Sequence, residues 1–410
     1  MNLLKNEIET LKVLFLHDNA TKSEIAEKSR LSTFVVSTAI ESLIKKGLVE
    51  VSKETLSKRG RPSNLYQIRL ESGYFLGISA DINSFNVVLI DTSNKVLGEK
   101  VYPTCSIEVS EKENKKKIDN FIEKLLFAID DFIGNNSIYV DSIHTIGLGI
   151  PGIIDTEKGI WLRGLRVPGI EDINIRKIIK DKYKKNVVIE DVARTVTYYE
   201  KAVGNGRNTT NFILLHMGFG VGGGIVINNE LYRGSYGFAG EIGHMAVEPS
   251  GYRCHCGNVG CLETVASVDG ILHHLNDRMN EVIVSKMHSH DFHLKEFKSL
   301  EEVLEAARKG DTFTRSVLSD IGTLIGDACS NLVLFFNPER IIISGPNLIL
   351  ADFLKDAIHQ RIKNKVVSEL LRKFELIFSR YSSNHEAYGC LLYTSPSPRD
   401  LSTSRMPSSA

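Results

Sequence analysis

The sequence predicts an α/β protein in which a small winged helix-turn-helix domain precedes a larger body. The chain has 410 residues, enough for two or three domains. Helical apolar spacing dominates residues 1–70, and strand-like and helical segments alternate from Tyr74 onward. The composition, with 42% hydrophobic and 24% charged residues, is that of an ordinary soluble globular protein.

Three helices are expected at the N-terminus. Thr21 and Glu24 have the spacing of a capping box, which predicts the start of the second helix. Ser32 is the expected N-cap of the third. The apolar stripe of the first helix is expected to consist of Leu4, Ile8, Leu11 and Phe15. That of the third is expected to consist of Val36, Ile40, Leu43 and Ile44.

The exposed start of the third helix is where a recognition helix presents side chains to base edges. The residues expected to contact DNA there are Thr33, Phe34, Ser37 and Thr38. Two strands, at 48–49 and 65–68, then predict a hairpin, the wing, whose tip carries Lys58, Arg59 and Arg61. Cations at such a tip suit phosphate contacts or a narrow minor groove. The alternative is a helical dimerisation or protein-interaction module with a solvated basic loop.

Charge and apolar runs narrow the class of protein. The formal net charge is zero, so no overall field draws the chain to nucleic acid, although residues 1–70 carry twelve Lys/Arg against eight Asp/Glu. No apolar run reaches transmembrane length, and the start lacks the apolar core of a signal peptide. Six cysteines, half of them in one motif, suit a reducing compartment. We therefore expect a cytoplasmic protein with no membrane partner.

The body begins with two expected adjacent strands, at 75–82 and 85–92, with a turn at Ser93-Asn94. Residues 115–133 have the periodicity of a long amphipathic helix. Further strands are expected within 144–155, 186–191, 211–232 and 340–346. Repeated alternation of strands and helices predicts an α/β body.

A metal-binding motif lies near the middle of the chain. His244 precedes Cys254, Cys256 and Cys261, which have C-x-C-G-x-x-G-C spacing. Three thiols and an imidazole are a complete tetrahedral set for Zn²⁺, and sulfur ligands favour zinc over magnesium or calcium. A closed set of four ligands leaves no position for water, so we expect a structural rather than a catalytic zinc. A catalytic zinc and a metal-free loop are the alternatives.

The segment at 240–264, GEIGHMAVEPSGYRCHCGNVGCLET, resembles the signature of the ROK family, which contains sugar kinases and sugar-responsive repressors. The turn at 149–152 and the glycine loop at 218–224 extend the resemblance over roughly residues 74–390. It implies that Glu241, His244 and Glu263 surround a sugar while His244 also holds the zinc, with Asp191 and Gly152 at the same site. Solvated surface acids are the alternative for the carboxylates.

The resemblance also implies an architecture. The body should have two lobes of actin-like, hexokinase-like fold, roughly 74–190 and 191–390, with a cleft between them. The sequence itself contains no repeat strong enough to derive two lobes. The tripeptide at 60–62, GRP, resembles the wing of the family's repressors, and the family forms dimers or tetramers.

Three departures from the family's kinases argue against phosphoryl transfer. The phosphate-cradling D-x-G-x-T turn is replaced at 79–83 by SADIN, and the second glycine loop reads Gly218-Phe219-Gly220. Alignment of 190–200 with the kinase motif places Val192 at the general base, where a valine cannot accept a proton. A shift of one residue would make Asp191 the base but would break the match at its neighbours. The family's Asn and Trp are also not evident at 163–167.

The remaining cysteines and the C-terminus have simple interpretations. Cys105, Cys329 and Cys390 are scattered and are expected to be free thiols. Residues 391–410 are rich in Ser, Pro and Arg and resemble adapter-derived translation, so we expect a non-native or disordered tail. Five histidines between 273 and 293 have irregular spacing and are expected to be solvated.

Together these features predict a sugar-responsive, DNA-binding transcriptional regulator, a repressor of a carbohydrate-use operon, with a kinase-like body that is not an enzyme. The expected partners are operator DNA and a sugar or sugar-phosphate effector, and the expected assembly is a homodimer or homotetramer. The alternative is an active ATP-dependent sugar kinase with an added regulatory domain. A third possibility is a sugar-binding module that acts through protein partners.

Overall fold

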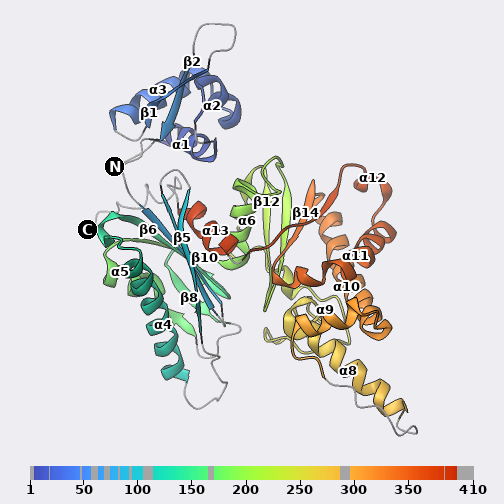
Figure 1. Ribbon diagram of the computed structural model, residues 1–410. Coiled ribbons are helices and arrows are strands. Elements are labelled where there is room, and N and C mark those ends of the chain that lie inside the picture. Colours follow the sequence, from blue (N-terminus) through green and yellow to red (C-terminus); the bar gives the residue numbers. More distant parts are fainter. Residues whose placement is uncertain are drawn as a thin grey trace, which may run out of the picture.

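The computed structural model describes residues 4–17, 19–46, 49–56, 63–68, 74–81, 84–91, 95–104, 114–164, 170–286, 296–382 and 384–394. These residues form an N-terminal domain and a body of two lobes, each built on a five-stranded sheet (Figure 1). The expected α/β class and the two-lobed body are therefore confirmed. The expected turn at Ser93-Asn94 and the wing tip at 57–62 lie outside the described residues.

The N-terminal domain contains three helices and a hairpin, α1 (Lys5–His17), α2 (Lys22–Ser29), α3 (Thr33–Lys45), β1 (Val49–Leu56) and β2 (Ser63–Ile68). The two strands pair antiparallel. Apolar side chains from every element meet in one core, which includes Leu11, Leu14, Ile25, Val36, Ile40, Leu43 and Val49. This small domain therefore has a core of its own. Each fully buried aliphatic side chain in it stabilises the fold by about 1.5–3 kcal/mol.

Both expected helix starts are confirmed. Thr21 accepts from the N–H of Glu24, whose carboxylate accepts from the N–H of Thr21 at 2.8 Å, and Ser32 accepts from the N–H of Val35 at 3.3 Å. Two expected core positions are wrong. Leu4 precedes α1 and is 65% exposed, and Ile44 is 40% exposed because it lies one residue, about 100°, around the helix from buried Leu43. The side chains of Ile8 and Phe15 lie outside the described part.

The first lobe has strand order β10-β6-β3-β4-β5. Strands β3 (Tyr74–Ala80), β6 (Ile143–Ile150) and β10 (Asn186–Asp191) are parallel, and β4 (Ser84–Asp91) and β5 (Val96–Pro103) complete it antiparallel. Helices α4 (Asn114–Asn135) and α5 (Ile175–Tyr183) share one core with the sheet. The short helix η2 (Val140–Ser142) precedes β6, and β7 (Ile153–Asp155), β8 (Ile160–Arg163) and β9 (Glu171–Ile173) form a small separate sheet.

The second lobe has strand order β13-β12-β11-β14-β15, with β11 (Phe212–Met217), β12 (Val221–Ile227), β13 (Glu230–Leu231), β14 (Arg340–Ser344) and β15 (Glu375–Phe378). Its helices are η3 (Ile242–His244), α7 (Glu263–Ala266), α8 (Val268–Lys286), α9 (Leu300–Arg308), α10 (Thr312–Phe336), η4 (Pro346–Leu350), α11 (Ala351–Lys365) and α12 (Ser368–Leu371). Their apolar faces and the sheet form the largest core of the chain. Helix α6 (Val192–Ala202) follows β10 and packs on β11 and β12.

The last helix described, α13 (Asn384–Thr394), returns to the junction of the two lobes, where it packs on α6 and on β3, β4 and β6 of the first sheet (Figure 1). The approach is close, because a Cβ on Gly77 would lie 2.2 Å from the carbonyl oxygen of Ala387. Leu391 is fully buried in this contact. The last described helix thus extends to Thr394, past the expected end of the body at 390, and it contacts both the first sheet and α6. Residues 395–410 lie outside the described part.

Helix α10 is long and apolar enough to cross a membrane by length and composition alone. Of its most apolar window, 61% is buried inside the protein, and α10 packs along α11. The apolar composition therefore serves the core of the second lobe, although the sequence was expected to contain no run of this length.

Candidate functional site

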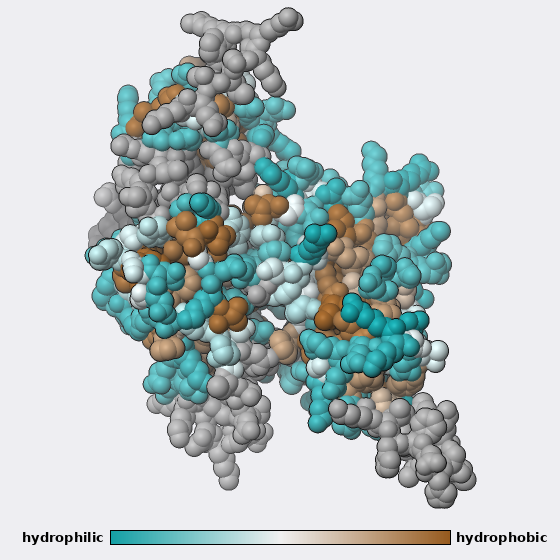
Figure 2. All heavy atoms as spheres, viewed as in Figure 1, coloured by the Kyte–Doolittle hydropathy of each residue, from teal (hydrophilic) through white to brown (hydrophobic). Residues whose placement is uncertain are grey.

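A pocket lies between the two lobes, at the carboxyl ends of the parallel strands of the first lobe. Figure 2 shows the hollow between the lobes on one face of the molecule. The empty space in the pocket is about 900 Å³, counting the part open to solvent. Its lining includes all five residues expected at the sugar site: Gly152, Asp191, Glu241, His244 and Glu263. Ligands of open α/β sheets commonly bind at this edge.

Glu241, His244 and Glu263 come from the segment that also carries the cysteines. Glu241 immediately precedes η3, and His244 ends it, so that His244 Nε2 lies 4.0 Å from Glu241 Oε2. Glu263 begins α7 and is 7% exposed, and its Oε2 accepts from the N–H of Val221 at 3.1 Å. Burial raises the pKa of Glu241, against the attraction of Arg194. Carboxylate oxygens arranged in this way can accept hydrogen bonds from sugar hydroxyls.

Gly152 and Asp191 form the opposite wall. Gly152 follows β6 with φ of 115°, and a Cβ there would lie 2.4 Å from the carbonyl oxygen of Arg163, so only glycine fits. Asp191 ends β10 and caps α6, accepting through Oδ1 from the N–H groups of Ala193 and Arg194 at 2.9 and 3.3 Å. Burial raises the pKa of Asp191 to about 7, with Arg194 opposing and Glu241 adding to the rise.

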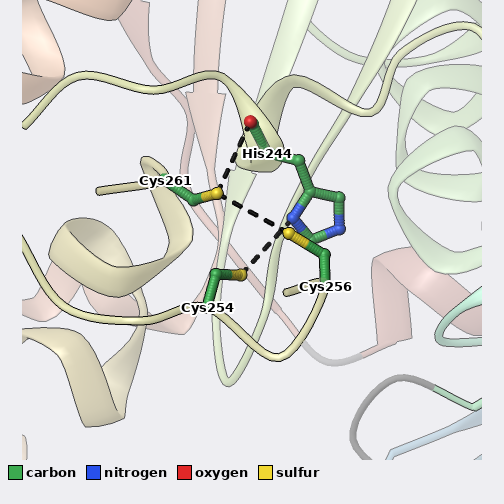
Figure 3. A group of neighbouring side chains, drawn as sticks. All are labelled: His244, Cys254, Cys256 and Cys261. Atoms are coloured by element: carbon green, nitrogen blue, oxygen red, sulfur yellow. Dashed lines mark hydrogen bonds between the residues drawn. The ribbon is translucent and has the colours of Figure 1, made fainter. Parts of the chain in front are cut away.

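The four expected metal ligands converge. One ligand atom from each of His244, Cys254, Cys256 and Cys261 lies within 4.8 Å of every other (Figure 3). Cys254 Sγ is 3.6 Å from His244 Nδ1, and Cys256 Sγ is 3.7 Å from Cys261 Sγ. A tetrahedral zinc with bonds of roughly 2.3 Å to sulfur and 2.0 Å to nitrogen requires separations of roughly 3.6–3.8 Å. The cluster therefore fits a metal ion of this kind.

The orientation of the His244 ring connects the cluster to the pocket. Its Nδ1 faces the cysteine sulfurs, and its Nε2 faces Glu241 on the pocket side. A metal held by the first nitrogen would fix the direction of the second. The dual role that the family resemblance implied is therefore geometrically possible here.

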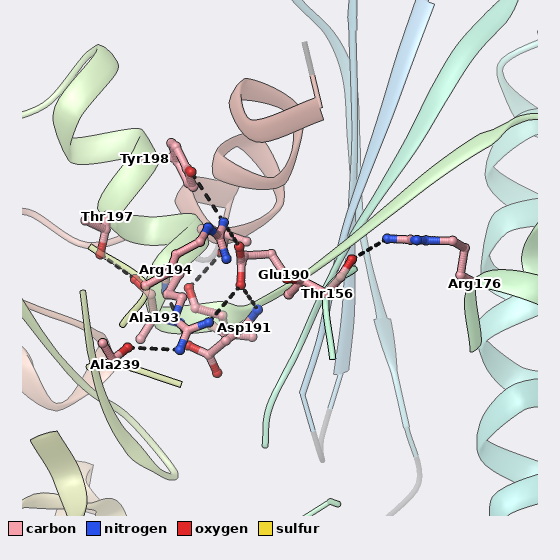
Figure 4. A network of polar contacts seen from close by, with 12 residues as sticks. Thr156, Arg176, Glu190, Asp191, Ala193, Arg194, Thr197, Tyr198 and Ala239 are labelled. Atoms are coloured by element: carbon pink, nitrogen blue, oxygen red, sulfur yellow. Dashed lines mark hydrogen bonds and ion pairs between the residues drawn. The ribbon is translucent and has the colours of Figure 1, made fainter. Parts of the chain in front are cut away.

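Val192, at the position expected for a kinase base, is the first residue of α6 and lines the pocket. The polar groups beside it are occupied. Buried Glu190 contacts Arg194 Nη1 at 3.4 Å and pairs with Arg233, while Arg194 Nη2 donates to the carbonyl oxygen of Ala239 at 2.9 Å (Figure 4). The charge of buried Arg194, which lies in the segment aligned with the kinase motif, is thus neutralised within the wall.

The glycine loop at 218–220 also lines the pocket, as do Ala80 and Asp81 at the end of β3. Asn347 donates to the carbonyl oxygen of Gly218 at 3.1 Å, which anchors the loop to η4. Of the replaced turn at 79–83, residues 82–83 lie outside the described part, as do 165–167 of the altered wall.

Sequence reasoning missed three pocket residues. His216 lies on β11, just before the glycine loop. Tyr381 follows β15, and Glu386 lies on α13. Tyr381 donates to Glu386 Oε1 at 2.6 Å, and His216 Nε2 lies 3.4 Å from the same oxygen. The available signal for His216 was a histidine inside an otherwise apolar strand, whereas Glu386, inside the expected body at 74–390, has no motif around it that would mark it.

At the N-terminal domain, the start of α3 is exposed as expected. Phe34 is 80% exposed and Thr33 and Thr38 are also exposed, whereas Ser37 is half-buried. Lys22 donates to Ser37 Oγ at 2.6 Å. The wing cations Lys58, Arg59 and Arg61 lie outside the described residues.

Fold and site together define a two-lobed, hexokinase-like protein with a helix-turn-helix domain at its N-terminus. The ROK family profile matches residues 76–394, and a profile described as sugar-specific transcriptional regulator TrmB matches residues 1–68. The chain belongs to the ROK family, as the sequence motifs had indicated.

Similar proteins match over nearly the whole chain. The xylose repressor of Bacillus subtilis is 26% identical over 386 residues, which cover 94% of this chain and 93% of that protein. The DNA-binding transcriptional repressor Mlc of Escherichia coli is 25% identical over 373 residues, or 91% and 88% of the two chains.

Solved structures share the fold. A ROK family transcriptional regulator described as a homolog of the E. coli MLC protein superimposes with a TM-score of 0.75 at 24% identity, over 97% of each chain. A ROK family glucokinase from Streptomyces griseus superimposes with a TM-score of 0.63 at 20% identity, over 78% of this chain and 98% of its own. The kinase thus matches a smaller share of this chain than the regulator does.

Proposed function

We propose that this protein is a sugar-responsive, DNA-binding transcriptional regulator that represses an operon for carbohydrate use, with xylose use as the first candidate. The observation that carries the proposal is the combination, on one chain, of a helix-turn-helix domain with a sugar-type pocket whose base position holds Val192. Full-length relatives named as repressors support the same assignment. Such a regulator works in the cytoplasm.

In this proposal the effector lies against Gly152, Asp191, Glu241, His244 and Glu263. A structural zinc on His244, Cys254, Cys256 and Cys261 would, when bound, hold the segment that carries Glu241 and Glu263 in place. The effector can release DNA only by binding one arrangement of the protein more tightly than the other. Paired half-sites require paired recognition helices, so we expect a homodimer or a tetramer built from dimers.

Selection from random duplex DNA with the full-length protein tests the DNA-binding half. We expect one enriched, two-fold symmetric site whose binding weakens when a sugar is added. No enriched site after repeated rounds would contradict a repressor and favour a module that acts through protein partners.

The second candidate, an ATP-dependent sugar kinase, is favoured by the carboxylate of Asp191 in the pocket and by the glucokinase-like fold of the body. A coupled assay with ATP and a hexose and pentose panel separates the two. Loss of a general base typically lowers a rate by ~10²–10⁴-fold, so we expect no turnover above background. Turnover near ~1 s⁻¹, within the ordinary enzyme range, would establish the kinase instead.

A further inference from the structure

A network of three charged side chains lies directly behind the walls of the pocket (Figure 4). Glu190, at the end of β10, is 1% exposed, and its two carboxylate oxygens pair with Arg194 of α6 and with Arg233, which follows β13. The same carboxylate accepts from the N–H of Asp191 at 3.0 Å. Because β10 belongs to the first sheet and Arg233 to the second lobe, this network joins the two lobes.

Arg194 is the member of the network that reaches both walls of the pocket. Its backbone N–H donates to Asp191 Oδ1 at 3.3 Å, on the wall that follows β10. Its Nη2 group donates to the carbonyl oxygen of Ala239 at 2.9 Å, two residues before Glu241 on the opposite wall. The side chain is 4% exposed, so these contacts are made away from water, where hydrogen bonds from a charged group are strong.

The charge of Arg194 acts on the carboxyl group of Asp191. Burial raises the pKa of Asp191, attraction to Arg194 opposes the rise, and the negative charges of Glu241 and Glu190 add to it. Without a cation at this place, close carboxylates would repel one another and one of them would hold a proton. Arg194 therefore favours the charged form of Asp191 while the acids of both walls face one pocket.

Stability alone does not account for a buried network of this kind. Taking charges out of water costs several kcal/mol per ion, and replacing a buried ion triad by apolar side chains of similar volume is often neutral or stabilising. What such a network can specify is the register of the elements that it joins. Here those elements are β10, α6 and the segment that leads to Glu241.

We propose that Arg194 is a positioning residue of the sensor, which holds Asp191 charged and at a fixed spacing from Glu241, so that one sugar can bond to both walls of the pocket. This inference rests on the proposed sensor function and deepens it. Arg194 acts through its neighbours, because its Nη1 and Nη2 groups are engaged by Glu190 and Ala239 and the residue is not among those that line the described pocket.

Calorimetry on the full-length, metal-loaded protein at pH 5 and pH 8 tests the inference. The probes are xylose, glucose and N-acetylglucosamine, and each variant is compared with the wild type at the same pH. Arg194→Met removes the charge, and we expect its loss of sugar affinity to be at least ~5-fold larger at pH 8 than at pH 5. At pH 5 Asp191 is protonated in either protein, because its pKa is about 7 with Arg194 present and higher without it.

The conservative variant separates charge from geometry. Arg194→Lys keeps the charge but cannot form the planar, two-sided contact of a guanidinium group. We expect it to weaken sugar binding by a similar factor at both pH values and to bind more tightly than Arg194→Met at pH 8. Arg361→Met removes an arginine that pairs with Asp327 outside the described pocket lining, and this control should leave sugar affinity unchanged.

A third variant keeps the test decisive should Arg194→Met fold poorly. Glu190→Met/Arg194→Met/Arg233→Met replaces the whole network by apolar side chains and leaves no buried charge without its partner, so we expect it to melt near the wild type. It should show the same pH-dependent loss of sugar affinity. A folded triple variant that binds sugar like the wild type at pH 8 would overturn the proposal.

Two further results would also overturn it. A loss of affinity in Arg194→Met that is equal at pH 5 and pH 8 would leave this residue a purely structural role. If no probe binds the wild type while the protein still binds its selected DNA, the sugar-sensing half of the proposed function is wrong, and the inference with it.

Discussion

The ammonium group of Lys22 on α2 donates to Ser37 Oγ on α3 at 2.6 Å, across the turn of the helix-turn-helix. Ser37 Oγ also lies 3.4 Å from Glu41 Oε1, so this hydroxyl is engaged on both sides. Thr38 in turn donates to the carbonyl oxygen of Phe34 at 3.1 Å. Ser37 and Thr38 thus donate their hydroxyl protons within the domain, and the 80% exposed ring of Phe34 is a large apolar group left facing outward at the start of α3.

An apolar contact in the major groove reads the methyl group of thymine. We expect Phe34→Ala to weaken binding to the selected DNA site by about tenfold, as for loss of a partly buried aromatic ring. Replacing single thymines by uracil should weaken the wild type by about fourfold at one position, since one buried methyl group contributes about 0.8 kcal/mol. Phe34→Ala should be insensitive to that replacement. Equal sensitivity of the two proteins to uracil would refute the contact.

The cations expected at the wing tip predict a change in the salt dependence of DNA binding. Arg59→Ala or Arg61→Ala should weaken binding almost equally on all DNA sequences and lower the slope of log K against log salt by about 1, as expected for one lost phosphate contact. Binding isotherms at several salt concentrations measure the slope. An unchanged slope in both variants would favour the protein-interaction alternative for this domain. Lys309→Ala, on the second lobe, is the control.

The cysteine cluster predicts a metal-dependent fold. Cys256→Ser should abolish zinc binding, measured as metal per chain, and lower the melting temperature by at least a few degrees, because metal affinity is folding free energy. Cys329→Ala, which changes a buried cysteine outside the cluster, should keep its metal. A Cys256→Ser protein that retains one equivalent of zinc and melts like the wild type would disprove the assignment.

Asp191 predicts a pH dependence. Its pKa is raised by burial to about 7, from an ordinary value of 3.8, so the folded chain keeps a proton that the unfolded chain has lost between these values. The associated stability is fully present below about pH 4 and is lost as the pH rises through 7. Asp191→Asn also caps a helix well but cannot ionise.

Urea unfolding at pH 5 and pH 8 measures the effect. The wild type should lose more stability between these two values than Asp191→Asn does. Equal losses in the two proteins would show that Asp191 has an ordinary pKa.

Sugar binding by the wild type should also vary between pH 5 and pH 8, because the protonated carboxyl group of Asp191 donates a hydrogen bond and the carboxylate only accepts.

The sequence-based expectations that the structure reproduces rested mostly on local patterns. The caps at Thr21 and Ser32 and the spacing of the cysteines specify geometry within a few residues, and the structure reproduces them. The hydrogen bond between Ser79 and Glu386 could not be predicted in this way, because the two residues are 307 positions apart and only the packing of α13 joins them. Helical periodicity also could not show that Leu43 is buried and Ile44 exposed. The width of the buried stripe on a helix depends on the neighbouring elements that cover it.

The return of α13 to the first sheet has a consequence for synthesis. The ribosome completes β3 more than three hundred residues before Leu391, so the apolar surface that awaits this helix stays uncovered throughout translation of the second lobe. Nascent chains of this protein should therefore depend on chaperones until α13 has been made, and a premature stop between β15 and α13 should yield insoluble product even though every ligand-facing strand has already been made.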